Sequence, residues 1–179
     1  MHAKTKRLTL LAVGTALFVV LSLCLQVPVF ENYYLCLGYV VMAVYCYSFG
    51  TLSGTVVGVF GVVLYCVVIS GLRGMPGWAL GNLVIGVALG LCYRATRGMK
   101  SHALRIAIHA VVIVASVAAG ILVVKSGTES VLYLQPFAVR VGKNFSAFVA
   151  DAAMLLLSEP FCLALDGPAR KILPELCVS

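Results

Sequence analysis

Apolar stretches long enough to cross a lipid bilayer recur along almost the whole chain. One membrane-spanning helix needs about 20 predominantly apolar residues. Such runs follow one another closely through the 179 residues, of which 62% are hydrophobic and only 11% charged. An ordinary soluble domain is about half apolar and about a quarter charged. Lipid and neighbouring helices must therefore surround most side chains, and we predict an all-α integral membrane protein.

Breaks between the apolar runs predict a bundle of about six membrane-spanning helices in a single domain, residues 1–179. Glycine, proline and polar residues interrupt the runs, which leaves expected spans at 9–26, 34–49, 54–70, 78–93, 106–124 and from after Pro136 to about 165. Only a tight turn, 50–53, separates the second span from the third. Glu159 and Pro160 predict a kink in the sixth, and a short amphipathic tail follows from about 166.

The positions of Lys and Arg predict the orientation in the membrane. With six spans both termini lie on one side, which carries most of the cations, namely Lys4, Lys6, Arg7, Arg94, Arg97, Lys100, Arg105, Arg170 and Lys171. Cytoplasmic loops are enriched in Lys and Arg, so we expect both termini in the cytoplasm. Three loops then lie outside, around Glu31, around Arg73 and over 125–136. The net charge of +7 follows from this topology, and no basic stripe with interleaved aromatics indicates nucleic-acid binding.

The chain lacks the sequence motifs of several enzyme classes. The chain has no G-x-x-x-x-G-K-[ST] loop to cradle phosphates, so it cannot use ATP by itself. It also lacks H-E-x-x-H and G-x-S-x-G, which leaves a hydrolase without a catalytic site. The seven cysteines are scattered singly with no C-x-x-C spacing, which favours reduced, buried thiols over disulfides or a metal site. We expect no enzyme, no cofactor and no metal.

Small residues recur at four-residue spacing, which allows helix backbones to approach closely. The glycine pairs, Gly50 with Gly54 and Gly58, Gly77 with Gly81, and Gly86 with Gly90, are best explained by packing within the bundle. Ala12 and Ala16 differ because the helix around them is otherwise bulky. A narrow notch at these two alanines could accept the helix of another protein.

The order of these features resembles one family over nearly the full chain. The basic N-terminus, A-V-G-T-A in the first helix, the hairpin L-G-Y-V-V-M-A-V-Y-C-Y-S-F-G-T-L-S-G-T-V-V-G and the external G-L-R-G-M-P-G-W-A-L-G-N resemble the substrate-specific S-components of energy-coupling-factor (ECF) transporters. The resemblance implies a multi-pass protein of the bacterial cell membrane that works with a transmembrane coupling subunit and two ATPase subunits. It also implies that Ala12 and Ala16 dock onto the coupling subunit.

A ligand site near the outer face is a further implication of the resemblance, and the sequence independently places polar residues there. Trp78 and Asn82 lie four residues apart, on one helix face below the Arg73 loop. The other candidates are Tyr33, Tyr34 and Tyr39 at the start of the second span, and Arg140 and Asn144 on the outer turns of the sixth. Ionisable groups at membrane depth usually face a cavity or a partner, which adds Lys143 and Asp151.

Structural interpretations of the same residues stay open. Trp78 and the tyrosines could form an interfacial aromatic belt, and Arg73, Arg140 and Lys143 could contact lipid headgroups. Asp151 could pair with Lys143 or Arg140 inside the bundle.

We predict that the chain binds a water-soluble vitamin with high affinity and passes it inward as an S-component. Gly, Ala and Val along 78–90 favour a wide vestibule and a bulky ligand such as cobalamin. Pantothenate is the main alternative because Arg73, Arg140 and Lys143 would suit a carboxylate. A stand-alone secondary transporter is the alternative of another class, but it needs ion-coupling carboxylates at mid-membrane, where only Asp151 qualifies.

Overall fold

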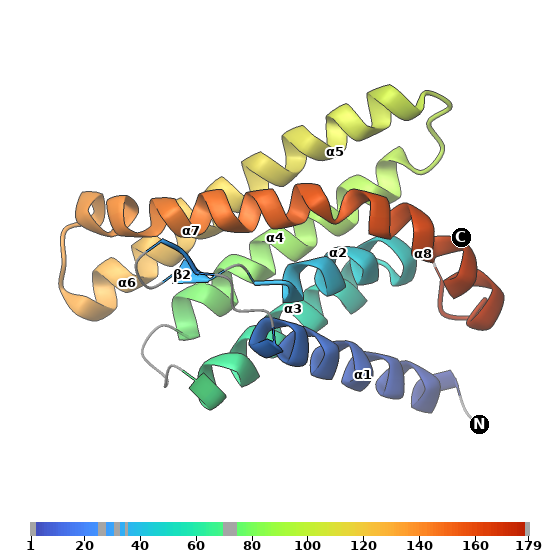
Figure 1. Ribbon diagram of the computed structural model, residues 1–179, viewed down its shortest axis with the longest axis horizontal. Helices are drawn as coiled ribbons and strands as arrows, with labels where there is room; N and C mark the ends of the chain where they lie inside the picture. The colour runs from blue at the N-terminus through green and yellow to red at the C-terminus, as the bar shows by residue number, and fades with distance from the viewer. Residues whose placement is uncertain (1–2, 25–27, 31–32, 35, 70–74, 178–179) are drawn as a thin grey trace.

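The computed structural model describes residues 3–24, 28–30, 33–34, 36–69 and 75–177, which form an elongated bundle of helices (Figure 1). The helices are α1 (Ala3–Cys24), α2 (Gly38–Phe49), α3 (Thr51–Ile69), α4 (Met75–Thr96), α5 (His102–Val117), the π-helix η1 (Ala118–Lys125), α6 (Ser126–Tyr133), α7 (Phe137–Leu157) and α8 (Glu159–Ile172). Two short strands, β1 (Pro28–Phe30) and β2 (Tyr33–Tyr34), pair antiparallel between α1 and α2. Apart from this small hairpin, the predicted all-α class is confirmed.

Four of the described helical segments are long and apolar enough to cross a membrane: α1, α3, α4 and the continuous helix from His102 to Tyr133. The α7–α8 pair, bent by 44°, counts as a fifth if it forms one span. With 12 residues, α2 is only about 18 Å long at 1.5 Å per residue, whereas the hydrocarbon core is about 30 Å thick. The prediction of about six spans is thus supported for four or five, and a full crossing by α2 stays a prediction.

The largest departure from the sequence-based prediction is the stretch from Lys125 to Pro136. We expected an external polar loop there, but α5, η1 and α6 form one uninterrupted helical segment to Tyr133. The helix ends at Leu134, which adopts a left-handed conformation with φ 53°. Ser126 and Glu129 are buried against neighbouring helices. Because these polar groups have partners inside the bundle, they do not need water and the helix continues.

The predicted kink in the last span is confirmed at Ser158, between α7 and α8. Glu159 lies at the bend and is buried. Its carboxylate accepts a hydrogen bond from the Tyr93 hydroxyl at 3.1 Å and lies 3.1 Å from His109 Nδ1. His109 Nε2 in turn lies 2.6 Å from Thr96 Oγ1. This buried cluster ties the bend to α4 and α5.

Glycines bring the central helices close together, as their spacing predicted. A Cβ at Gly81 would lie 2.8 Å from the carbonyl oxygen of Gly120 on η1, and one at Gly86 would lie 2.8 Å from Thr55 Oγ1 on α3. The tight turn between α2 and α3 is Gly50, with φ 90°, a backbone conformation that favours glycine. The glycine pairs therefore serve packing within this chain.

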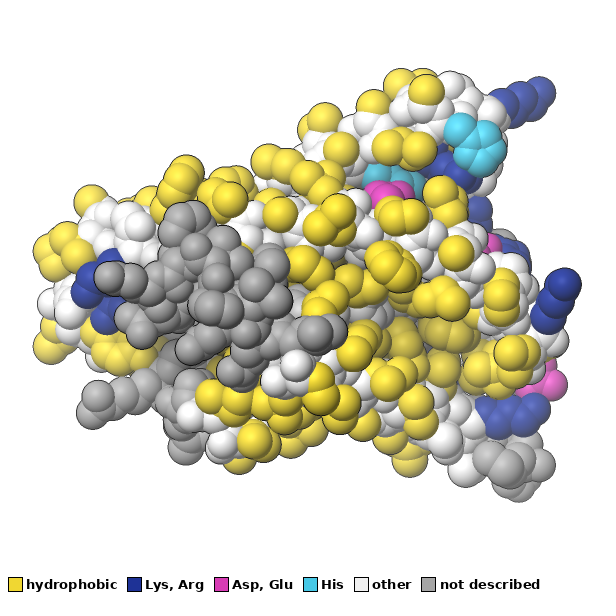
Figure 2. All heavy atoms as spheres, viewed as in Figure 1, with side chains coloured by type: hydrophobic (Ala, Val, Ile, Leu, Met, Phe, Trp, Pro, Cys, Tyr) yellow, Lys and Arg dark blue, Asp and Glu magenta, His cyan; other side chains and the backbone are white. Residues whose placement is uncertain are grey.

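Both ends of the described chain lie at the same end of the bundle (Figure 1), where Lys6 Nζ and Glu175 Oε2 form an ion pair of 3.0 Å. Figure 2 shows that Lys and Arg side chains gather mainly at this end, whereas hydrophobic side chains cover the middle of the molecule. This distribution fits the expected orientation, and a cytoplasmic location for this end stays a prediction. Five of the seven cysteines are buried, as the sequence predicted for most of them.

Candidate functional site

A buried hydrogen-bonded network centres on the Tyr39 hydroxyl in the first turn of α2. Trp78 Nε1 of α4 donates a hydrogen bond to this oxygen at 2.9 Å. Asn82 Oδ1 lies 2.9 Å from it and Asp151 Oδ2 of α7 lies 3.1 Å from it. Tyr39 and Asn82 are completely buried, and Asp151 is 4% exposed. Three helices far apart in sequence thus meet at one oxygen atom.

The number of protons on the Tyr39 hydroxyl limits how many hydrogen bonds it can donate. A tyrosine hydroxyl has one proton, so Tyr39 can donate fully to only one of Asn82 and Asp151 at a time. The other acceptor then lacks a full hydrogen bond from Tyr39. Asn82 is fixed from its other side because its Nδ2 donates to the carbonyl oxygen of Gly58 at 3.0 Å.

A second polar cluster lies where α6 packs against α7. Asn144 Nδ2 donates to Ser126 Oγ and to Glu129 Oε2, both at 3.0 Å. Arg140 Nη1 lies 3.6 Å from the same Glu129 oxygen, and its guanidinium carbon lies 4.3 Å from the centre of the Tyr133 ring. These contacts neutralise Arg140 within the bundle, so lipid headgroups are not its main partners.

Lys125, the last residue of η1, connects the two clusters. Its side chain is buried, and its ammonium lies 5.0 Å from the centre of the Trp78 ring, which is a cation–π contact. Among the residues that the structure describes, no carboxylate lies within ion-pair distance of this ammonium. π-Helical turns within α-helices occur often at functional sites, and η1 ends at this lysine.

The structure brings together five of the eight residues predicted to bind substrate. Tyr39, Trp78 and Asn82 share the first cluster, and Arg140 and Asn144 share the second. The Tyr33 and Tyr34 backbones form β2, which lies beside α7 (Figure 1), but their side chains fall outside the described part of the chain. Arg73 also lies outside the described residues.

The pairing considered for Asp151 is wrong. The Asp151 carboxylate lies within hydrogen-bond distance of the Tyr39 hydroxyl, which donates to it. Arg140 instead pairs with Glu129, and Lys143 is exposed on α7. The aromatic-belt interpretation is also wrong for Tyr39, which is 0% exposed in the core.

Sequence reasoning missed three residues of this region: Lys125, Ser126 and Glu129. We assigned them to a solvated loop because polar residues follow one another there. A signal was nevertheless present, since Lys125 and Glu129 are four residues apart and residues 125–135 contain no proline. That spacing places both on one face of a helix.

Ala12 and Ala16, the predicted docking residues, are both exposed on α1. The opposite face of α1 carries the buried residues Gly14 and Phe18, which pack against α2 and α3: a Cβ on Gly14 would meet the Tyr45 ring, and Phe18 lies against Gly61. The two alanines therefore point away from the rest of the bundle.

Comparison with known proteins identifies the family. The family model for the S component of ECF-type riboflavin transporters matches residues 2–161, whereas no curated protein and no solved structure matches the chain. Proteins of this family are multi-pass proteins of the cytoplasmic membrane that work with a coupling T subunit and two ATPases and bind a small vitamin in the membrane. The match covers most of the sequence, and the chain belongs to the family of ECF-type riboflavin transporter S components.

Proposed function

We propose that this chain captures riboflavin at the network around Tyr39 and delivers it inward together with its coupling subunit and ATPases. Membership of the family supports a vitamin-specific substrate-binding subunit, and the name of the family favours riboflavin. The observation that carries the location is the convergence of Tyr39, Trp78 and Asn82 on one buried, polar point.

The chemistry of the network suits a flavin. Riboflavin has a flat aromatic ring system edged with hydrogen-bond donors and acceptors, a polyhydroxyl chain and no net charge. The indole of Trp78 and the phenol of Tyr39 offer aromatic surface, and Asn82 and Asp151 offer polar atoms. Sites for small ligands commonly combine aromatic walls with a few well-placed polar groups.

The physical reason for favouring cobalamin, the ligand that the sequence suggested, does not hold. Cobalamin was expected because small residues of α4 would line a wide vestibule. Instead, Gly77 faces the backbone of Lys125, Gly81 faces Gly120, and the glycines further along α4 face α3. The small side chains are occupied by helix packing, and the family match does not support cobalamin either.

Pantothenate stays the second candidate because of one observation. Arg140 pairs with Glu129 and Lys143 is exposed, so neither offers a buried, uncompensated cation. The buried ammonium of Lys125 over Trp78 would, however, suit a ligand carboxylate. Pantothenate would need the Lys125 ammonium to pair with its carboxylate, whereas uncharged riboflavin would not.

The single tryptophan of the chain, Trp78, allows a direct test. Riboflavin titrated into the purified protein is expected to quench tryptophan emission until the site is saturated, and mass spectrometry of an extract is expected to find a flavin that survives purification. Pantothenate and cobalamin are titrated in parallel as competitors. A saturable response to pantothenate or cobalamin but not to riboflavin would overturn the assignment.

We further propose that the exposed face of α1 around Ala12 and Ala16 is the surface that meets the coupling subunit. The two alanines are exposed beside bulkier exposed residues, Val13, Leu17 and Val20, so this face presents small side chains next to large ones. Small residues at such spacing allow a partner helix to pack closely in a membrane.

A further inference from the structure

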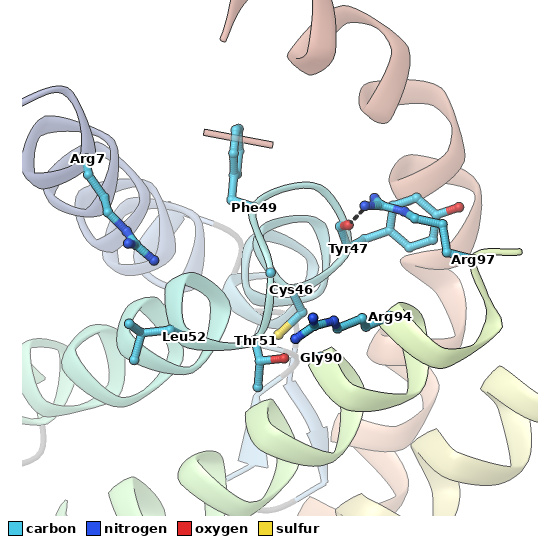
Figure 3. A pocket seen from close by; sticks show the side chains of 10 residues that line it. Arg7, Cys46, Tyr47, Phe49, Thr51, Leu52, Gly90, Arg94 and Arg97 are labelled. Atoms are coloured by element: carbon cyan, nitrogen blue, oxygen red, sulfur yellow. Dashed lines mark hydrogen bonds between the residues drawn. The ribbon is translucent and has the colours of Figure 1, made fainter. Parts of the chain in front are cut away.

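A pocket of about 300 Å³ lies at the end of the bundle that contains both termini. It is bounded by α1, by the turn between α2 and α3 and by the end of α4 (Figure 3). Three arginines line it, Arg7 from α1, Arg94 from the last turn of α4 and Arg97 just beyond that helix. We call it the arginine pocket. It is far from the polar network, which lies at the opposite ends of α2 and α4.

Two of these cations lack an acidic partner among the described residues. Figure 3 shows Arg7 and Arg94 extending from their helices toward the start of α3, whereas Arg97 turns to the Tyr47 carbonyl oxygen, 2.7 Å away. No acidic residue lines the pocket. Arg7 and Arg94 are exposed, so water screens their mutual repulsion, but both guanidinium groups attract an anion that enters the pocket.

The acidic residues at this end of the described chain are engaged elsewhere. Asp166 pairs with Arg97 at 3.4 Å and with Arg170 at 2.8 Å, and Glu175 pairs with Lys6. The carboxylates that could neutralise Arg7 and Arg94 from within the described chain are thus already committed to other cations.

The start of α3 adds to the positive potential. Gly50, Thr51 and Leu52 line the pocket, and the first backbone bond of the helix runs from Gly54 N to Gly50 O at 3.1 Å. The preceding N–H groups have no partner within the helix. Such groups and the helix dipole favour a bound anion, here beside two arginines that favour it independently.

We propose that the arginine pocket binds a phosphate group. Arginine forms paired, charge-assisted hydrogen bonds with phosphate oxygens. Phe49 and Leu52 give the pocket apolar walls, and Leu52 is 63% exposed on the side of the bundle. A ligand with an anionic head and an apolar body fits this lining, so the headgroup of an acidic phospholipid is favoured over free phosphate as the source.

The test compares lipid retention by variants of the full-length protein in nanodiscs that contain phosphatidylglycerol and phosphatidylcholine. The double variant Arg7→Gln/Arg94→Gln removes the two cations of the pocket. The control, Lys4→Gln/Lys100→Gln, removes the same charge from exposed positions outside the pocket. Native mass spectrometry is expected to show retained phosphatidylglycerol in the wild type and the control, and about tenfold less in the pocket variant.

Equal retention by all three proteins would overturn a lipid source, and equal loss in the pocket variant and the control would show diffuse attraction instead of a site. A second arm adds inorganic phosphate to protein in phosphatidylcholine alone and measures thermal stabilisation. Stabilisation of the wild type but not of the pocket variant would identify free phosphate as the source. If neither lipid nor phosphate distinguishes the variants, the proposal is wrong.

A conservative variant guards against a folding defect. Arg7→Lys/Arg94→Lys keeps both charges but loses the paired hydrogen bonds, so we expect retention between those of the wild type and the glutamine variant. Circular dichroism and gel filtration check that each variant is folded and monodisperse. If the folded lysine variant retains as little lipid as the glutamine variant, the result still supports phosphate recognition by arginine. Full retention by the lysine variant would mean that positive charge alone binds the lipid.

Discussion

The Tyr39 hydroxyl shows how much single residues reveal before a structure is known. Trp78 and Asn82 could be paired from their spacing, and Asp151 could be singled out because a carboxylate at membrane depth is costly. Their meeting point could not be predicted, because it depends on α2, α4 and α7 packing side by side. The partner of Asp151 could not be identified for the same reason: the sequence offered a cation as one alternative, whereas packing supplies a phenol.

At this scale we expect Asn82→Ala to weaken riboflavin binding by about 1–3 kcal/mol. The substitution removes one acceptor near Tyr39 Oη and leaves the Gly58 carbonyl oxygen without its donor. Titration calorimetry of the purified variant measures the change, and a thermal melt separates it from loss of folding. Wild-type affinity in a folded variant would exclude Asn82 from the site.

Arg140→Ala is expected to weaken binding by a similar amount, about 1–3 kcal/mol, because Glu129 then lacks its cation and Asn144 loses its fixed acceptor. Lys143→Ala is the matched control, since Lys143 lies three residues further along α7 but is exposed. The two variants are compared by the same calorimetric titration. Equal affinities would mean that the second cluster does not support the ligand site.

At the scale of helices, boundaries could be predicted where local sequence signals set them. The prediction failed where tertiary contacts determine whether a segment is helical. Gly50 ends α2, and Pro160 follows the bend after α7, as their backbone preferences indicate. The helical course through Lys125 and Glu129 was missed because their polarity suggested water. Only the neighbouring helices α4 and α7 provide partners that make a helix favourable there.

The close contact between α4 and η1 gives a prediction about stability. Gly81→Ala places a Cβ 2.8 Å from the Gly120 carbonyl oxygen, a backbone atom that cannot move without shifting a helix, so we expect a loss of about 1–3 kcal/mol. Gly127→Ala is the control, because no atom lies within 4 Å of its added Cβ and alanine favours helix. Thermal melts in detergent compare the two. A Gly81→Ala protein as stable as the control would contradict the close packing.

At the scale of the whole molecule, the sequence was sufficient for class and family but not for the ligand. Long apolar runs, cations near their ends and the order of small-residue motifs can all be recognised without knowing any contact. A wide vestibule along α4 was expected because glycine suggests space, although the same glycines are used for close helix packing. Complete spanning by α2 and the cytoplasmic location of the termini are still predictions.

Dependence of uptake on the coupling and ATPase subunits distinguishes an S component from a stand-alone transporter. Ala16→Trp is expected to abolish vitamin uptake and co-purification of the ATPase subunits while riboflavin affinity stays unchanged, because the added ring fills the exposed face of α1. Val111→Trp, on the exposed side of α5, is the control for bulk added at a lipid-facing position. Uptake at the wild-type rate by Ala16→Trp would place the docking surface elsewhere, and uptake without any ATPase subunit would favour a secondary carrier.

The short length of α2 has a consequence for how a vitamin meets this protein. If α2 ends near one membrane surface, its length of about 18 Å places its start about two-fifths of the way in from the other surface of a core about 30 Å thick, and we expect Tyr39 to lie below the headgroups. If the proposed site is correct, a vitamin that reaches the Tyr39 hydroxyl exchanges most of its hydration water for contacts with side chains. Release would then require water to return to a buried polar network, and we expect slow dissociation and scavenging from dilute surroundings.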